Sequence, residues 1–379
     1  MSFKLNLIAF SLVIFSLATN CVAADYTVAA YYFPGWHSDS KNIYRARDWT
    51  GWDQLKNATP KFAGHQQPKI PLCGYEDETI PSVMGKKIST AVKYGVNAFI
   101  FDWYYNNSGP YLNDALDKSF LTSNNNRLKF AVMWANHPVN GESAFVSDKT
   151  YDMITDTLVE KYFKNISYLK IDNKPYFSIY DIDVFVKNFG GVDGAAKALD
   201  KLRQKAKKAG FSDIYLSIVQ MKLMSQPSIS VNSLLLKLKA NCVDSYVWVH
   251  RANMNNFPTT LYDDMMAGAI DHWYKSKSVY SVPFYPNVTM GWDPSPRANQ
   301  DNKLKWKKGN YPYTTVLVGN TPDKFFHALT EAKKYLDKSG YKNKFITINA
   351  WNEWTEGSYL EPDTINQYKY LEAIESVFK

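Results

Sequence analysis

Cysteine is scarce in this sequence of 379 residues. Cys21 lies in an N-terminal apolar segment, which leaves Cys73 and Cys242 for the rest of the chain. Two thiols are far too few for a disulfide framework, so the fold must be stabilised by its core. Hydrophobic residues make up 45% of the sequence, which is ample for such a core.

Motifs that bind cofactors or activate nucleophiles are also missing. The sequence has no GxSxG elbow, no HExxH, no P-loop and no GxGxxG after a strand. Its six histidines show no metal-ligand spacing, and Asp181-Ile-Asp183 is too short to be a calcium loop. We therefore expect a reaction that uses no metal and no cofactor.

Long apolar runs are confined to the first residues of the chain. Lys4 is followed by a mostly apolar stretch, Leu5 to Leu17, and then by the small residues Val22-Ala23-Ala24. This pattern predicts a cleavable signal peptide over residues 1–24 and a secreted or periplasmic protein. An uncleaved anchor and a lipoprotein at Cys21 are the alternatives. No later run is long enough for a membrane helix, so we expect no stable membrane insertion.

The net charge of +8 is not concentrated in one stripe. Basic residues are scattered along segments of helical period, such as Lys201 to Lys208. Nucleic-acid binding needs a concentrated basic surface, so we expect no nucleic-acid partner. An anionic substrate or envelope surface is the alternative reading of this charge. No linker or repeat interrupts residues 25–379, which we expect to form one catalytic domain and a monomer.

Short β-rich runs alternate with longer segments of helical period in this domain. The expected strands are Thr27–Phe33, Asn97–Trp103, Lys129–Trp134, Pro175–Tyr180, Ile214–Val219, Val243–Val247, Val282–Val288 and Phe345–Ala350. The expected helices are Ser82–Tyr94, Tyr111–Lys118, Lys149–Phe163, Ala195–Ala209, Ser228–Ala240, Thr260–Lys277, Pro322–Lys338 and Gln367–Phe378. This alternation predicts an α/β fold, a single (β/α)8 TIM barrel with elaborated βα loops, whose active site lies at the carboxyl ends of the strands.

Polar and aromatic residues gather where these strands end. Aromatic residues make up 16% of the sequence, and a pocket of rings edged with hydrogen-bonding groups suits a sugar. The alternative is that many of these rings are core. Gln220 follows the fifth strand. The candidate binding residues are Tyr32, Trp36, His37, His65, Asp102, Trp103, Tyr104, Trp134, Asn136, His137, Tyr180, Trp248, Arg251, Trp292, Asp293, Asn349, Trp351 and Asn352.

The barrel geometry also places the two cysteines. Cys73 falls in a loop on the side of the expected active site, whereas Cys242 enters the sixth strand from the opposite side. We therefore expect no disulfide bond between them.

The most informative stretch is NAWNEWTEGSYLEPD, residues 349–363, at the end of the eighth strand. Residues three apart are neighbours, about 5–6 Å between Cβ atoms, only where the backbone is turned. Gly357 and the polar run favour such a turn, which would bring Glu353 and Glu356 together. Glycosidic bonds are cleaved by carboxyl pairs, with a gap of roughly 5–5.5 Å for retention and about 6.5–9.5 Å for inversion. The two acids should then differ in pKa, one acting as a base and the other as an acid.

An E-x-x-E pair alone is common on solvated helices. Here Trp351, Asn352 and Trp354 surround the pair at the end of a buried strand, which favours a site. The sequence therefore predicts that Glu353 and Glu356 are catalytic and that an oligo- or polysaccharide is the partner.

Seven segments, spread over nearly the whole chain after residue 24, together form a recognisable series: residues 31–37, 64–68, 94–104, 134–136, 168–175, 292–297 and 349–362. In these segments the chain resembles the glycoside hydrolase 99-like proteins, which include the WbsX group first labelled as glycosyltransferases and, more remotely, the endo-α-mannosidases. Two segments of the chain depart from the family pattern: Asp48-Trp-Thr-Gly-Trp-Asp53 lacks a family glutamate, and Trp292-Asp-Pro-Ser-Pro-Arg297 replaces Trp-Asp-Asn-Thr-Pro-Arg.

The resemblance implies a retaining reaction through a 1,2-anhydro sugar. Glu353 would be the base at the 2-hydroxyl, and Glu356 would protonate the leaving oxygen and then deprotonate water. A glycosyltransferase and a non-catalytic glycan-binding barrel are the alternatives.

Overall fold

The computed structural model describes residues 26–41, 49–138, 143–219, 230–252, 254, 256–301 and 306–379. The expected signal peptide, Asp48 and Gln220 lie outside the described residues.

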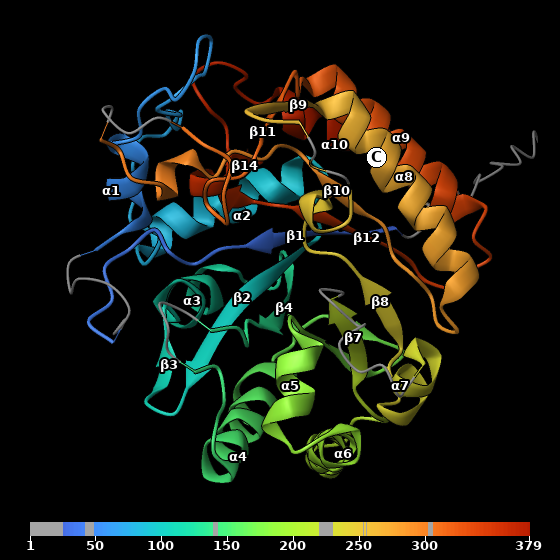
Figure 1. The fold of residues 1–379 in the computed structure, drawn as a ribbon. Helices are drawn as coiled ribbons and strands as arrows, with labels where there is room; N and C mark the ends of the chain where they lie inside the picture. Colours follow the sequence, from blue (N-terminus) through green and yellow to red (C-terminus); the bar gives the residue numbers. More distant parts are fainter. Residues whose placement is uncertain are drawn as a thin grey trace, which may run out of the picture.

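Eight parallel strands form a nearly closed barrel (Figure 1). They are β1 (Tyr26–Tyr32), β2 (Ala98–Asn106), β4 (Lys129–Trp134), β6 (Lys174–Ile179), β7 (Tyr215–Val219), β8 (Cys242–Asp244), β10 (Asn287–Thr289) and β12 (Lys344–Asn349). Their order in the sheet is β10-β12-β1-β2-β4-β6-β7-β8. Val243 in β8 bridges to Phe284, just before β10, which brings the two ends of the sheet together. The predicted (β/α)8 barrel and its eight strands are confirmed.

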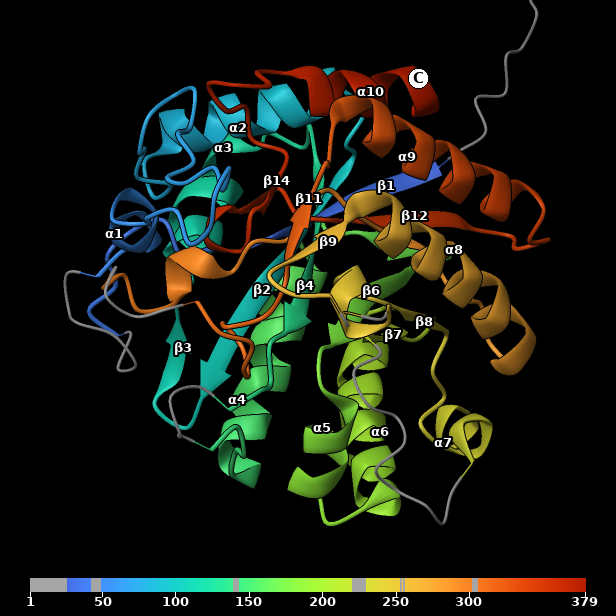
Figure 2. The ribbon, with the colours of Figure 1, turned by 45° about the horizontal axis from the view of Figure 1, so that its top comes forward.

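Helices surround these strands on the outside (Figures 1 and 2). They are α1 (Gly51–Lys56), α2 (Pro81–Lys93), α3 (Leu121–Ser123), α4 (Asp148–Thr157), α5 (Ile182–Asn188), α6 (Val192–Lys208), α7 (Val231–Lys237), α8 (Tyr262–Val279), α9 (Pro322–Asp337) and α10 (Lys369–Phe378). In α6, Leu199 and Leu202 face the core, and Lys207 and Lys208 carry charge on the exposed side. This division is typical of an amphipathic helix packed on a sheet.

The helix predicted over Tyr111–Lys118 is wrong in its first half. Tyr111 belongs to a short strand, β3 (Gly109–Tyr111), which pairs antiparallel with the end of β2. Leu112 then adopts a positive φ of 54°, which no right-handed helix accommodates. Helical geometry begins only in a π-helical turn at Ala115–Phe120.

Short strands elaborate the loops. On the side of the barrel where the strands end, β9 (Thr259–Leu261) pairs with β11 (Val316–Val318), as Figure 2 shows, and β13 (Asn352–Glu353) pairs with β14 (Ser358–Tyr359). At the start of β6, β5 (Lys170–Ile171) forms a hairpin. These strands are too short for sequence periodicity to reveal.

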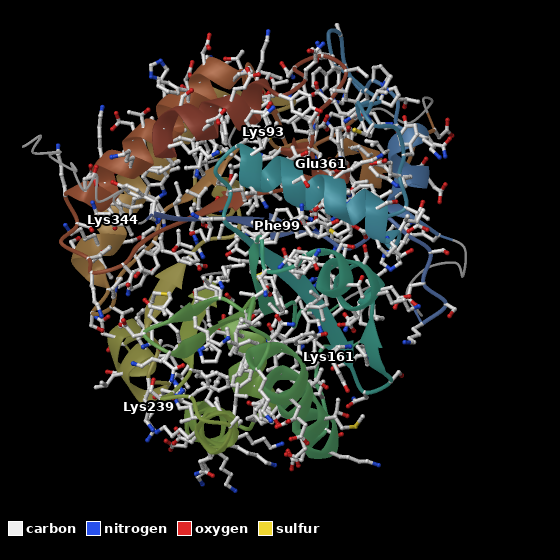
Figure 3. All side chains as sticks on the ribbon, turned by 180° about the vertical axis from the view of Figure 1, so that it is seen from behind. Lys93, Phe99, Lys161, Lys239, Lys344 and Glu361 are labelled. Atoms are coloured by element: carbon white, nitrogen blue, oxygen red, sulfur yellow. The ribbon has the colours of Figure 1, made fainter. Side chains whose placement is uncertain are left out.

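Aromatic packing fills the region between β2 and its neighbours. The Phe99 ring lies 5.2 Å from the Tyr32 ring and 4.9 Å from the Trp351 ring, and Figure 3 shows it in the interior. The lysines labelled in Figure 3 are instead spread around the molecule, as expected for scattered basic charge. Cys73 and Cys242 are both free thiols, which confirms the prediction of no disulfide. Among the described residues, no helix has the length and apolar character needed to span a bilayer.

Candidate active site

A cavity of about 670 Å³ lies at the carboxyl ends of the strands. Residues in or after β2, β4, β6, β8, β10 and β12 all contribute to its wall. The predicted site residues that line it are Asp102, Tyr104, His137, Tyr180, Trp292, Glu353 and Glu356. Its wall also contains Gln54, Met133, Ala135, Pro138, Tyr246, Val247, Val249, His250, Met254, Arg297, Tyr311, Pro312 and Thr314.

The chain turns sharply after β12, as the sequence predicted. Glu353 ends β13, Trp354–Glu356 form a 3-10 turn, and Gly357 closes it with a left-handed φ of 63°. Asn352 fixes this hairpin to the loop after β1, because its side chain accepts from the Phe33 N–H at 2.8 Å and donates to the Phe33 carbonyl at 2.9 Å. Both glutamates of the E-x-x-E pair therefore face the same cavity.

The loop after β10 holds the backbone of this turn. The Asp293 N–H donates to the Glu356 carbonyl at 2.5 Å. Any Cβ at Gly357 would approach the Asp293 backbone nitrogen to 2.9 Å, so only glycine fits here. The Asp293 carboxylate bonds to His65 at 2.8 Å and accepts from Gln67 at 2.7 Å. Burial alone would raise the Asp293 pKa, but these hydrogen bonds lower it. A third loop thus braces the turn that carries Glu356.

Arg297 joins the two glutamates. One guanidinium nitrogen donates to Glu356 Oε1 and the other to Glu353 Oε2, both at 2.8 Å. Its Nε donates to Thr355 at 2.8 Å. The Tyr311 hydroxyl accepts from Arg297 at 2.5 Å and donates to Glu356 Oε1 at 2.8 Å. Both carboxylates are therefore fixed by one planar fork of donors.

Burial dominates the electrostatics of this group. The Glu353 side chain is 4% exposed, and burial raises its pKa well above the usual range. Arg297 opposes this shift, whereas Glu356 and Asp102 reinforce it. Burial alone would lower the pKa of Arg297, but Glu353, Tyr311 and Glu356 raise it well above its usual range. Arg297 is therefore permanently charged, while the protonation of Glu353 is sensitive to its surroundings.

Asp102 is a third carboxylate in the cavity wall. It lies on β2, accepts from the Tyr246 hydroxyl at 2.9 Å, and is only 4% exposed. Burial raises its pKa well above the usual range, the Tyr246 hydrogen bond lowers it, and Glu356 raises it further. Burial lowers the pKa of His137 and takes that of His250 to about 4, so both rings are neutral near neutral pH.

The other candidates do not line the cavity. Three of them surround the fully buried Glu78, which accepts from the Tyr32 hydroxyl and the Trp36 N–H at 2.8 Å and bonds to His37 at 2.9 Å. These residues fix the loop after β1, and Asn352, His65 and Asp293 brace the loops as described above.

Most of the remaining candidates are held by buried contacts. Trp351 donates to Glu361, which Figure 3 labels, at 3.0 Å. Trp248 donates to the Asn287 carbonyl at 2.7 Å. Asn136 exchanges hydrogen bonds with the Asp181 backbone at 2.8 and 2.9 Å.

The last four candidates also lie away from the cavity. Trp103 packs edge-on against Tyr162, and the Trp134 side chain donates to the Tyr105 carbonyl at 3.4 Å. Asn349 is completely buried. Arg251 is partly buried, and burial lowers its pKa to about 10.

Arg297, Tyr311 and Tyr246 line the cavity but are not among the residues predicted from the sequence. Arg297 was visible as part of the Trp292–Arg297 motif, and Tyr246 follows β8 closely. Tyr311 lies in a long loop with no periodic signal. Within the described ranges, no group of three or more His, Cys, Asp or Glu is arranged to hold a metal ion.

The family model described as Glycosyltransferase WbsX matches residues 28–374 of this chain. The chain belongs to this WbsX family. An "Uncharacterized protein WxcX" of Xanthomonas campestris pv. campestris is 25% identical to the WbsX-family chain over 360 residues, which cover 92% of the chain and 49% of the relative. The chain thus spans about half the length of this curated relative.

Two solved structures resemble the WbsX-family barrel. The GH99 endo-α-mannosidase of Bacteroides thetaiotaomicron in complex with Bis-Tris propane has a TM-score of 0.58 at 16% identity, over 93% of this chain and 96% of that chain. A "Glycoside hydrolase-like protein" has a TM-score of 0.60 at 15% identity, over 94% of each chain. At these identities the likeness shows the fold, a barrel of the glycoside-hydrolase type.

Proposed function

We propose that this WbsX-family protein is a retaining glycoside hydrolase that cleaves an oligo- or polysaccharide in this cavity, with Glu353 and Glu356 as the acid–base pair. The observation that carries the proposal is the Arg297 fork, which holds both carboxylates in one cavity wall. Arg297 occupies Oε2 of Glu353 and Oε1 of Glu356 and leaves the second oxygen of each for a substrate.

The distance limit is compatible with a retaining pair. Because one guanidinium binds both carboxylates, the two bonded oxygens lie no more than about 8 Å apart, the reach of two N–H···O bonds across the fork. A retaining pair needs roughly 5–5.5 Å between its carboxyl groups.

The proposed reaction has two steps. Glu353 removes the proton of the sugar 2-hydroxyl, whose oxygen attacks the anomeric carbon while Glu356 protonates the leaving glycosidic oxygen. Glu356 then deprotonates a water that opens the 1,2-anhydro ring at the anomeric carbon, and Glu353 returns its proton to the 2-oxygen. A base works best when its pKa lies near the working pH, and burial shifts the pKa of Glu353 in that direction.

A glycan panel tests this proposal. The full chain is incubated with oligosaccharides of different sugars and linkages, and products are followed by NMR from the first minutes. We expect one linkage to be cleaved with its anomeric configuration retained. The double variant Glu353→Gln/Glu356→Gln, prepared in the same way, controls for contaminating glycosidases. Inverted products, or no cleavage of any glycan, would overturn the proposal.

Glycosyl transfer is the second candidate, because the family's description names it. Transfer requires an activated sugar donor, and an exported chain has no access to cytosolic nucleotide sugars. Incubation with UDP- and GDP-sugars and acceptor glycans separates the two functions. Longer glycans would establish transfer, and binding without any product would indicate a glycan-binding barrel.

We also propose export to the cell exterior or periplasm, based on residues 1–24, and a monomeric state. N-terminal sequencing of the protein from its native host should begin at residue 25 if the signal is cleaved there. Light scattering should give the mass of one chain.

A further inference from the structure

The third carboxylate of the cavity, Asp102, has only one of its two oxygens hydrogen-bonded by the residues around it. Its Oδ2 accepts from Tyr246, but its Oδ1 is buried and finds no hydrogen-bond partner among the described residues. A buried carboxylate oxygen without a donor is costly, so such a group usually awaits a proton or a ligand.

Arg297 does not provide the missing cation. Its nitrogens are bonded to Glu353, Glu356, Tyr311 and Thr355. Within the described part of the cavity wall, Arg297 is the one permanently charged cation, against the three carboxylates of Asp102, Glu353 and Glu356. The cavity therefore carries an excess of negative charge when its acids are ionised.

The titratable groups that act on Asp102 come from several strands. They are Tyr31, Tyr104, Tyr180, Tyr246, Glu353, Glu356 and Arg297. The tyrosines are neutral at physiological pH, as tyrosine ordinarily is, and burial first of all raises their pKa values further. Only Arg297 in this group opposes the negative charge.

We propose that Asp102 is a specificity-determining residue whose carboxylate makes the cavity select polyhydroxylated cyclic amines, in their protonated form, over neutral sugars of the same shape. The inference rests on the proposed function because it treats the cavity as a sugar site. The same excess negative charge would stabilise positive charge that develops on a sugar ring during cleavage.

Matched ligand pairs test this selectivity without any turnover. Calorimetric titration at several pH values between 5 and 8 compares 1-deoxymannojirimycin with 1,5-anhydromannitol, and 1-deoxynojirimycin with 1,5-anhydroglucitol. Each pair differs in a ring amine against a ring oxygen. For at least one pair we expect the wild type to bind the amine about tenfold to a hundredfold more tightly, the range of a hydrogen bond to a charged group. Equal binding within both pairs would overturn the proposal.

Variants then assign the effect to Asp102. Asp102→Asn should weaken the preference for the amine, while the control Asp244→Asn should keep it in full. Asp244 is a good match because it is also buried and bonded to a tyrosine, Tyr176 at 2.8 Å, but lies outside the cavity wall. Circular dichroism verifies that each variant is folded. An unchanged preference in Asp102→Asn would contradict the inference.

A second variant covers the case in which Asp102→Asn does not fold. The Tyr246 hydrogen bond lowers the pKa of Asp102, so Tyr246→Phe should move the rise of amine selectivity to higher pH. An identical pH profile in Tyr246→Phe would contradict the role of Asp102. Failure of the glycan panel would leave these binding results intact, so the two proposals can fail separately.

Discussion

Buried acids in two places of this barrel, the core and the cavity wall, differ in how many of their carboxylate oxygens are hydrogen-bonded by the chain. Asp244, in β8, accepts from Tyr176 and Ser217 at 2.8 Å and from Tyr31 at 3.3 Å. These hydrogen bonds engage both of its oxygens. This acid is completely buried and is not part of the wall of the 670 Å³ cavity.

The acids of the cavity are satisfied only in part. Glu353 and Glu356 share one arginine, and Asp102 has one tyrosine and an unpartnered oxygen. Both groups pay the cost of burial, but only the second keeps hydrogen-bonding capacity open to a ligand. Asp244 is thus satisfied within the core, whereas the cavity acids keep the hydrogen-bonding capacity that the proposed binding and chemistry require.

The largest effect on stability is expected from removing Arg297, which pairs with two of the cavity acids. Arg297→Met leaves two buried carboxylates without their cation, so the free energy of unfolding should fall by about 3–5 kcal/mol at neutral pH. The loss should shrink at low pH, where protonation removes the repulsion. Urea denaturation at several pH values measures both effects.

Arg203 provides the control for that experiment. Its buried side chain donates to the carbonyls of Leu238 and Lys239 and does not touch the cavity. Arg203→Met should lose stability with a weaker dependence on pH, because the carboxylate that Arg203 pairs with at 3.5 Å, Asp213, is partly exposed. An Arg297→Met protein as stable as the wild type at pH 7 would contradict the proposed clamp.

The next largest effect is the change with pH in the contribution of Asp244 to the free energy of unfolding. Burial raises its pKa to about 6, against roughly 3.9 in an unfolded chain, so the folded state favours the protonated acid. The protonated Asp244 therefore contributes about 3 kcal/mol to the free energy of unfolding. This contribution is fully present below about pH 4 and is lost as the pH rises through 6. The unfolding free energy of the wild type minus that of Asp244→Asn should therefore fall between pH 4 and 7. A difference that does not change with pH would show that Asp244 is not buried in this way.

Gly357 controls the position of Glu356 in the turn. Gly357→Ala places a methyl group against the Asp293 backbone in a left-handed conformation, which should cost about 1–3 kcal/mol and reduce turnover. Gly64→Ala is the control, because Gly64 has φ 77° but open space around it. Thermal unfolding should show the larger loss in Gly357→Ala, and equal losses would argue against the contact with Asp293.

The smallest effect is expected from the Tyr311 hydroxyl. Tyr311→Phe removes one hydrogen bond to Glu356 and one from Arg297 in a partly exposed side chain, so kcat/KM should fall by about tenfold or less. Tyr313→Phe, whose hydroxyl accepts from the Asn299 N–H outside the cavity wall, is the matched control. Steady-state kinetics on the substrate found in the glycan panel compares them, and equal rates would remove Tyr311 from the site.

The sequence predicted the barrel because each buried strand is a compact run of β-forming residues. It also predicted the turn after β12, since Gly357 and the polar residues around it rule out a continuing strand. The cavity then received Glu353, Glu356 and Asp102 from the strand ends, as expected for a (β/α)8 barrel.

The sequence did not predict which strand-end side chains point into the cavity and which point into the surrounding core. Trp103 and Trp134 sit at strand ends like Asp102, yet they pack into the core because successive residues of a strand point to opposite faces. Arg297 and Tyr311 come from irregular loops, whose path depends on contacts such as Asp293 with His65 and Gln67. No local pattern encodes such long-range contacts.

The role proposed for Glu356 as the general acid–base group is tested most directly by the rate at which Glu356→Gln cleaves the glycan that the wild type cleaves. We expect a loss of at least about a hundredfold, the lower range for removal of a general acid–base group, in a protein that unfolds at the wild-type temperature. A folded Glu356→Gln protein that cleaves the same bond at the wild-type rate would contradict this role.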